Sequence, residues 1–302
     1  MDKDEIKNII TTFVINDFHL VNNNRPVKNC LNVIALKYDK LGAQILYSFL
    51  FIKGDLIDSV KKSHLQNSKT NSLTPIIVSE TKITDDCINY TYEEFSEKIG
   101  GLVNTGLILL DNISEIIYQL GHHELPIGLD GTPDELLEIY VKEILQFLLT
   151  SPAKRYGSDR RFESLPDGIV LGKDLIIQFD SKSYSSGFGF SLDDIERFSK
   201  YVNDFNRRYS GILNRVFSFV VVTGKFNDSE ESIENRKKTF YQKCQTSLSC
   251  IDCNNLSSIL NLVKRNLKCR ESIDWKEIFS NTIITKELLE KEIKRISKDN
   301  II

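Results

Sequence analysis

The sequence lacks three features that would each define a class of protein. Residues 1–17 contain no charged segment followed by an apolar run and a cleavage site, so the chain does not resemble a secreted precursor. No uninterrupted apolar stretch is long enough to cross a bilayer. The formal net charge is −3, which is atypical of proteins that bind nucleic acid over a broad basic surface. We therefore expect a globular cytoplasmic protein whose contacts with nucleic acid, if any, are local.

Cysteine usage does not indicate a disulfide framework. The chain has six cysteines in 302 residues, and without a secretory signal reduced thiols are expected. Zinc sites need two close pairs of ligands, and only Cys250 and Cys253 have such spacing. That pair lies in a segment with the composition of a buried strand, so the sequence disfavours a zinc site.

A loop rich in proline and glycine divides the chain. Residues 123–133 hold two prolines and two glycines between two apolar, periodic regions, which predicts a boundary between domains at 1–125 and 126–302. The first domain is expected to be a smaller α/β or helical unit, and it carries no motif that indicates chemistry. Its predicted strands are 31–38 and 73–79, and its predicted helices are 42–63, 91–100 and 113–120.

The second domain has the pattern of an α/β fold. A helix is predicted over 134–149, because apolar residues recur there at intervals of three and four. Further strands are predicted over 168–171, 175–182, 216–223 and 248–253, and further helices over 192–205, 233–243 and 256–266. This order predicts a mixed sheet flanked by helices.

The segment from Pro166 to Lys182 contains the most informative pattern. If residues 173 and 174 form a two-residue hairpin turn, counting outward places Asp167 opposite Asp180. Because side chains alternate along a strand, Lys182 lies on the same face as Asp180. Two carboxylates that converge repel each other unless a cation lies between them, and a hard divalent ion such as Mg²⁺ meets that requirement. Lys182 could then orient or deprotonate a water molecule near the ion.

Two simpler interpretations remain open at this point. Asp180 and Lys182 could form an ordinary ion pair on a strand edge, since an Asp-x-Lys triplet by itself is common. Four cations just before the motif are the best candidates for contact with DNA, but they could also belong to a solvated loop. These cations are Lys154, Arg155, Arg160 and Arg161.

Residues 134–266 resemble the PD-(D/E)-x-K nuclease superfamily, and most closely the cleavage domain of the type IIS restriction endonuclease FokI. The motifs that carry the resemblance are Pro166-Asp167-Gly168, Phe179-Asp180-Ser181-Lys182 and the helix that contains Glu138. The resemblance implies a restriction-endonuclease-like fold in a bacterial or archaeal protein. It also implies that Asp167, Asp180 and the Ser181 backbone carbonyl bind Mg²⁺, which Mn²⁺ may replace, with Glu138 as an outer ligand.

The same resemblance implies an activity and a dimer. Lys182 would assist the attacking water, and double-stranded DNA would be hydrolysed to 5′-phosphate and 3′-hydroxyl ends. Two cleavage domains would pair, stably or transiently, through the helix bearing Asp193 and Arg197. A pair within that helix is the alternative, since residues four apart are neighbours. Ser191 and Asp194 have the spacing of a capping box, which supports a helix start at this position.

The part of the chain before residue 126 matches no recognition region, so three functions remain open. The protein could be a type IIS-like restriction enzyme, or its cleavage subunit, in which residues 1–125 recognise DNA. It could be the nuclease subunit of an antiviral or repair complex, in which residues 1–125 bind a protein partner. It could also be a DNA-binding module without activity, although the intact Asp167, Asp180 and Lys182 argue against this.

Overall fold

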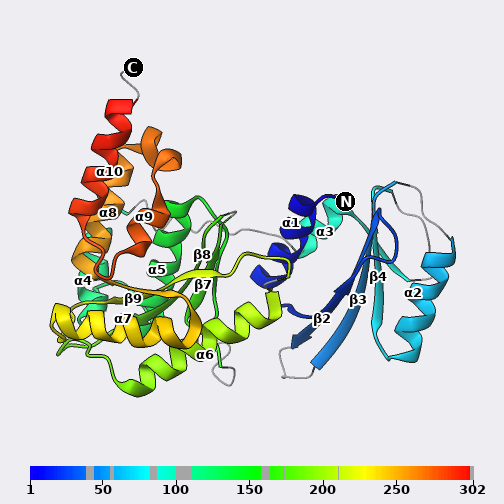
Figure 1. The fold of residues 1–302 in the computed structure, drawn as a ribbon, viewed down its shortest axis with the longest axis horizontal. Helices are drawn as coiled ribbons and strands as arrows, with labels where there is room; N and C mark the ends of the chain where they lie inside the picture. Colours follow the sequence, from blue (N-terminus) through cyan, green and yellow to red (C-terminus); the bar gives the residue numbers. More distant parts are fainter. Residues whose placement is uncertain are drawn as a thin grey trace. The chain divides into compact units, whose positions relative to one another are not determined.

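The chain forms two compact units (Figure 1). A computed structural model describes residues 1–38, 44–54, 58–81, 87–99, 110–157, 164–172, 174–209 and 211–299. The first unit comprises Met1–Val103 and Arg208–Leu213, and the second comprises Asn104–Arg207 and Asn214–Ile302. The predicted division into domains at 1–125 and 126–302 stays a prediction about which parts of the chain fold independently. Among the described residues, no helix is both long enough and apolar enough to cross a membrane.

The first unit is a five-stranded mixed sheet with helices on both faces. Strands β1 (His19–Asn24), β2 (Cys30–Tyr38) and β3 (Gln44–Ile52) pair antiparallel, and β3, β4 (Thr74–Ser79) and β5 (Ile88–Thr91) pair parallel. Helices α1 (Lys3–Ile15) and α3 (Tyr92–Ile99) cover one face, and α2 (Asp58–Thr70) covers the other (Figure 1).

Aromatic side chains form the core between α1, α3 and the sheet. Phe13 of α1 packs edge-on against Phe49 with ring centroids 4.7 Å apart, and Phe51 packs against Phe95 of α3 at 5.0 Å. Helix α1 starts with a capping box, in which Asp2 accepts a hydrogen bond from the Glu5 amide and Glu5 accepts one from the Asp2 amide. Local and tertiary interactions therefore both favour this helix.

The helix predicted over residues 42–63 is wrong. Residues Gln44–Ile52 form strand β3, and α2 starts only at Asp58. Strand β3 is rich in aromatic and β-branched residues, and such residues pack well on a pleated surface. Gly54 follows the strand in a left-handed conformation (φ 79°) that favours glycine, so the chain turns there. The predicted strand over 73–79 and the helices over 91–100 and 113–120 are confirmed within a few residues.

The second unit contains the mixed sheet that the sequence predicts, in the order β10-β9-β8-β7-β6. Strands β6 (Ala153–Arg155), β7 (Gly168–Leu171) and β8 (Ile176–Lys182) pair antiparallel. Strands β8, β9 (Val216–Thr223) and β10 (Ser247–Asp252) pair parallel. The helices are α4 (Ile113–Gly121), α5 (Pro133–Leu149), α6 (Leu192–Tyr209), α7 (Glu230–Cys244), α8 (Cys253–Arg265), α9 (Trp275–Ser280) and α10 (Lys286–Asp299), with a 3₁₀ helix at Leu267–Ser272.

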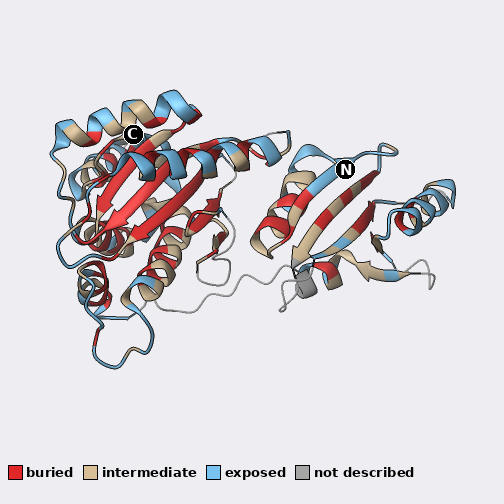
Figure 2. Ribbon diagram, turned by 90° about the horizontal axis from the view of Figure 1, so that it is seen from below, coloured by how far each residue is buried: buried red, intermediate tan, exposed pale blue. Residues whose placement is uncertain are grey.

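Helices cover both faces of this sheet, so its strands are almost entirely buried (Figure 2). Phe179 of β8 packs in the same core cluster as residues of α4, α5 and α8. On the opposite face, Phe198 of α6 stacks on Phe219 of β9 with ring centroids 4.6 Å apart. Burial on both faces explains the near-continuous apolar sequence of β9. Polar residues in β8 are therefore exceptions that need an explanation.

Candidate active site

The hairpin of β7 and β8 has the register that the sequence predicts. Gly168 pairs with Phe179 and Leu171 pairs with Ile176, while the Gly172 amide donates to the Leu175 carbonyl at 2.9 Å. Continued by one step, this register places Asp167 beside Asp180. The Ser181 amide donates a hydrogen bond of 2.6 Å to Oδ2 of Asp167, which fixes the Asp167 carboxylate against β8. Lys173, in the predicted turn, lies outside the described residues.

The glycine of the Pro-Asp-Gly segment is needed because the strands pack closely around it. A Cβ atom at Gly168 would overlap the ring of Phe179 and lie 2.5 Å from the Lys154 carbonyl oxygen. Any larger residue would therefore push β7 away from its neighbours and move Asp167. This is a packing requirement rather than a backbone one, since Gly168 is not among the described residues with positive φ.

Asp180 and Lys182 form a buried ion pair, so the alternative of a surface pair is wrong. Asp180 is only 3% exposed, and the Lys182 side chain is 17% exposed. The Lys182 ammonium also lies 5.8 Å from the centroid of the Phe198 ring of α6. Apart from its ion pair with Lys182, the buried Oδ1 of Asp180 accepts no hydrogen bond from the described residues. Such an oxygen can act as a ligand for a cation.

The electrostatics of the site follow from burial and from its two carboxylates. Burial raises the pKa of Asp167 well above its ordinary value, and the neighbouring charge of Asp180 raises it further. Burial by itself would lower the pKa of Lys182, but Asp180 and Asp167 outweigh burial and raise that pKa. Lys182 therefore carries its proton in the metal-free protein. It acts there as a cation and hydrogen-bond donor, not as a base.

Glu138 of α5 lies at the edge of this cluster and pairs with Arg155 of β6. Nη1 of Arg155 donates to Oε2 of Glu138 at 3.0 Å, and both side chains are mostly buried. Burial raises the pKa of Glu138, with a contribution from Asp180, whereas Arg155 opposes the increase. Gly157 makes room for the pair, since a Cβ atom there would overlap Oε2 of Glu138 and lie 2.5 Å from Nη1 of Arg155.

The predicted DNA-binding residues are only partly described. Lys154 and Arg155 are both half-buried on β6, where Lys154 pairs with Ile169 of β7. Arg160 and Arg161 lie outside the described residues. The pairing of Arg155 with Glu138 gives this arginine a structural role beside the carboxylates. Its contact with DNA stays a prediction, as do those of the other three residues.

The carboxylates have the donor chemistry that Mg²⁺ prefers. Mg²⁺ in proteins commonly binds one or two carboxylates and retains several water molecules. Among the described residues, no three His, Cys, Asp or Glu side chains are arranged to hold a metal ion. Asp167 and Asp180 would thus need other oxygens to complete the coordination. The Ser181 carbonyl as one of these, and Glu138 as an outer ligand, stay predictions.

Helix α6 presents the two residues predicted to form a dimer contact. Asp193 and Arg197 are both exposed. Within the helix Nη2 of Arg197 donates to Asp194 at 2.6 Å, so the alternative of a pair between Asp193 and Arg197 in one helix is wrong, whereas the dimer contact stays a prediction. Asp194 also exchanges hydrogen bonds of 3.0 Å with Ser191, which confirms the predicted capping box.

Tyr201 is a residue near the site that the sequence did not indicate. Burial raises its pKa, and the charges of Asp180 and Asp167 add to the increase. Tyr201 comes three residues after Phe198 and four after Arg197 on α6, so it shares their face of the helix. Its spacing of four residues from Arg197 could have indicated that the two side chains are neighbours on one helix. The sequence does not show that α6 packs over β8, which brings Tyr201 near the carboxylates.

The mixed sheet, the hairpin and the Asp167, Asp180 and Lys182 group define a PD-(D/E)-x-K nuclease domain. Comparison with protein families makes the assignment more specific. The model of the family "FokI, cleavage domain" matches residues 111–285, and the chain belongs to this family. The match includes α4, which precedes the boundary predicted at residue 125. No curated protein matches the sequence.

A search of solved structures found matches at low sequence identity and low TM-score. Restriction endonuclease FokI bound to DNA is 17% identical, with a TM-score of 0.44, and the match covers 67% of this chain and 37% of that chain. FokI without DNA is 18% identical, with a TM-score of 0.43, and coverages of 57% and 30%. A SAVED/CARF-domain receptor, Cap4 of Moraxella osloensis, is 9% identical, with a TM-score of 0.22, and coverages of 82% and 68%. The matched region thus spans little more than a third of FokI.

Proposed function

We propose that the protein is a Mg²⁺-dependent endonuclease that hydrolyses phosphodiester bonds of double-stranded DNA to 5′-phosphate and 3′-hydroxyl ends. The observation that carries the proposal is the convergence of Asp167 and Asp180 beside the buried ammonium of Lys182. Membership of the FokI cleavage family supports it. The biological role that fits best is a type IIS-like restriction enzyme or its cleavage subunit, with residues 1–125 contacting DNA or a protein partner.

The side chains would divide the chemistry among them. Asp167 and Asp180 would hold Mg²⁺, which supplies neutralising charge for the phosphate and lowers the pKa of a bound water. Lys182 pairs with Asp180 and lies over the ring of Phe198, and these contacts keep its ammonium beside the carboxylates. There it would orient the attacking water or bind a phosphate oxygen. The positive charge of Arg155 would balance the negative charge of Glu138, so the pair would add little net charge to the site.

The test compares Asp180→Ala with Asp174→Ala, an exposed aspartate in the turn of the same hairpin. Plasmid DNA is incubated with each protein and Mg²⁺, and the ends are sequenced. Asp180→Ala should abolish cleavage and Asp174→Ala should not, because only Asp180 belongs to the carboxylate pair. Cleavage by Asp180→Ala at the wild-type rate would contradict the site. Ends at a fixed distance from a motif would support a restriction enzyme, whereas random ends would favour specificity supplied by a partner.

We also propose that cleavage of both strands requires two chains paired through α6. One site attacks one phosphodiester, so antiparallel strands call for a second site related by a twofold axis. Each Asp193 would meet the partner's Arg197, which would then exchange its pairing with Asp194 for one across the interface. Asp193 and Arg197 are both exposed, as such a contact requires.

Charge reversal tests this pairing. Arg197→Asp should slow linearisation of a plasmid far more than nicking, because like charges would face each other across the twofold axis. Mixing Arg197→Asp with Asp193→Arg should restore linearisation. Lys238→Asp, at an exposed position of α7, is the matched control because it reverses a charge away from α6. Linearisation by Arg197→Asp that is first order in enzyme and as fast as wild type would exclude the dimer.

A further inference from the structure

The two faces of the sheet in the first unit differ in composition. Helix α1 packs on the sheet with the apolar residues Ile9, Ile10, Phe13 and Val14 buried. Helix α2 buries only a histidine and a serine, His64 and Ser68. A helix that covers a sheet normally turns an apolar stripe toward it. Val60 of α2 does pack, partly buried, on a small apolar cluster of the sheet, but the rest of the face that α2 turns toward the strands is polar.

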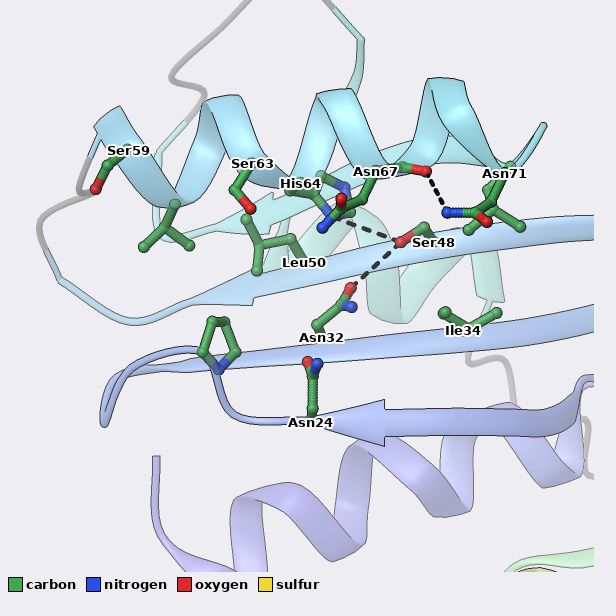
Figure 3. Close-up of a pocket in the computed structure, with 13 residues that line it drawn as sticks. Asn24, Asn32, Ile34, Ser48, Leu50, Ser59, Ser63, His64, Asn67 and Asn71 are labelled. Atoms are coloured by element: carbon green, nitrogen blue, oxygen red, sulfur yellow. Dashed lines mark hydrogen bonds between the residues drawn. The ribbon is translucent and has the colours of Figure 1, made fainter.

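A cavity of about 370 Å³ lies between α2 and strands β1 to β3 (Figure 3). Four asparagines line it. Asn24 comes from β1, Asn32 from β2 and Asn67 from α2, and Asn71 directly follows α2. On the strands the apolar side chains of Ile34 and Leu50 line it together with Ser48, and Val60 adds apolar surface from α2. None of the described lining residues is an acid, a lysine or an arginine.

His64 lines this cavity and retains an unused hydrogen-bonding group. The residue is 6% exposed, and among the described residues its Nε2 has no hydrogen-bond partner. Its Nδ1 lies 3.5 Å from Oγ of Ser48, which in turn donates to Oδ1 of Asn32 at 3.3 Å (Figure 3). Burial lowers the pKa of His64 to about 4, so the ring is neutral at pH 7. A buried polar atom without a partner costs stability unless a ligand or water satisfies it.

We propose that this cavity binds a nucleobase. A base is an uncharged ring whose edge alternates hydrogen-bond donors and acceptors, and asparagine amides and a neutral histidine offer the complementary groups. The apolar side chains of the strands would contact the faces of the ring. Enzymes that read an extruded base combine the same two elements, hydrogen bonds to the edge of the base and apolar contacts to its faces.

Two sources of the base share this chemistry. The base could be extruded from the DNA substrate, in which case the inference rests on the proposed function. It could instead belong to a free nucleoside that binds independently of DNA. The absence of charge among the described lining residues argues against a phosphate or a carboxylate inside the cavity itself. A sugar is also uncharged and forms hydrogen bonds, so the experiment must distinguish the binding of a sugar from the binding of a base.

The test fills the cavity from an exposed position of α2. Ser63→Phe places a ring in the cavity, because Ser63 lines it and is exposed enough to be replaced without disturbing the core. Gln66→Phe is the matched control, since Gln66 is exposed on α2 but does not line the cavity. A third variant, Asn32→Leu, replaces the amide with an apolar side chain of the same branching. All three are measured in the full chain, with circular dichroism to verify folding.

Saturation-transfer NMR and calorimetry measure the binding of the four deoxynucleosides, with glucose and ribose as comparisons. At least one nucleoside should bind the wild type, and Ser63→Phe and Asn32→Leu should each weaken it about tenfold or more, as expected for loss of base contacts. Gln66→Phe should bind like the wild type. Binding of the sugars but of no nucleoside would overturn the proposal.

Duplex DNA that contains 2-aminopurine distinguishes the two sources. Fluorescence that rises with wild type and Gln66→Phe, but not with Ser63→Phe, would show that the base comes from DNA. Nucleoside binding without this rise would identify a free nucleoside as the source. Neither signal, in wild-type protein that is folded, would refute the proposal. The same measurements on Asp180→Ala separate the cavity from the nuclease site, since base binding should persist there when cleavage is lost.

Discussion

Replacing Lys182 with methionine removes the cation that pairs with Asp180 while keeping an unbranched side chain against Phe198. Removing one partner of a buried ion pair costs about 3–5 kcal/mol, because the other charge stays buried. Asp180 has a side chain only 4% exposed, so this range applies to it. Asp167, whose pKa is already raised, can take up a proton and relieve part of the repulsion. We therefore expect a loss of about 3 kcal/mol near pH 8, and a smaller loss near pH 5.

Urea unfolding measures this loss in EDTA and in excess Mg²⁺. In EDTA the two carboxylates of Lys182→Met face each other without a cation, whereas bound Mg²⁺ would supply one. The stability difference from wild type should therefore shrink when Mg²⁺ is added. Cleavage should stay at least about a hundredfold below wild type, since the positioned proton donor is absent. Lys200→Met, at an exposed position of α6, is the control. Equal stability of Lys182→Met and wild type in EDTA at pH 8 would refute the reasoning.

Two further predictions concern stability. A fragment starting at Leu110 should be several kcal/mol more stable to urea than one starting at Gly128, because α4 buries Ile116, Ile117 and other apolar side chains in the core of the second unit. Equal stability of the two fragments would show that α4 is dispensable. Burial lowers the pKa of His64 from 6.5 to about 4 in the folded chain, so between these pH values the unfolded chain binds a proton more readily than the folded chain does. The stability that neutral His64 contributes is therefore present above pH 6.5 and is lost as the pH falls toward 4. Wild type should lose about 3 kcal/mol more than His64→Gln between pH 7 and pH 4, and parallel pH profiles would contradict the shift.

The sequence predicted the hairpin and its register because both depend on local rules. A two-residue turn and the alternation of side chains were sufficient to place Asp167 opposite Asp180, and the pairing of Gly168 with Phe179 confirms this. The helix predicted over residues 42–63 was wrong because the structure there depends on contacts that are distant in the sequence. The apolar content of these residues fits a helix as well as a strand, and only pairing with β2 and β4 decides in favour of β3.

The supporting residues of the site could not be predicted, because they depend on packing between distant segments. Glu138 and Arg155 are 17 residues apart, and their pairing requires the approach of α5 to β6. The burial of Asp180 and Lys182 likewise depends on α6 covering β8. A strand that ends in Asp-x-Lys does not show whether a helix packs over it. That packing decides whether the pair is buried or lies at the surface.

The asymmetry of the sheet in the first unit bears on how such a protein can acquire new specificity. The aromatic cluster of Phe13, Phe49, Phe51 and Phe95 anchors the strands from one side, without help from the residues that line the cavity on the other. Asn67 is exposed and belongs neither to that aromatic cluster nor to the small apolar cluster of Cys30, Leu50, Ile52 and Ile77, so substitutions there need not disturb the core. Evolution can alter such a position by single steps while the fold persists, so lineages that share this scaffold are free to diverge in what they bind.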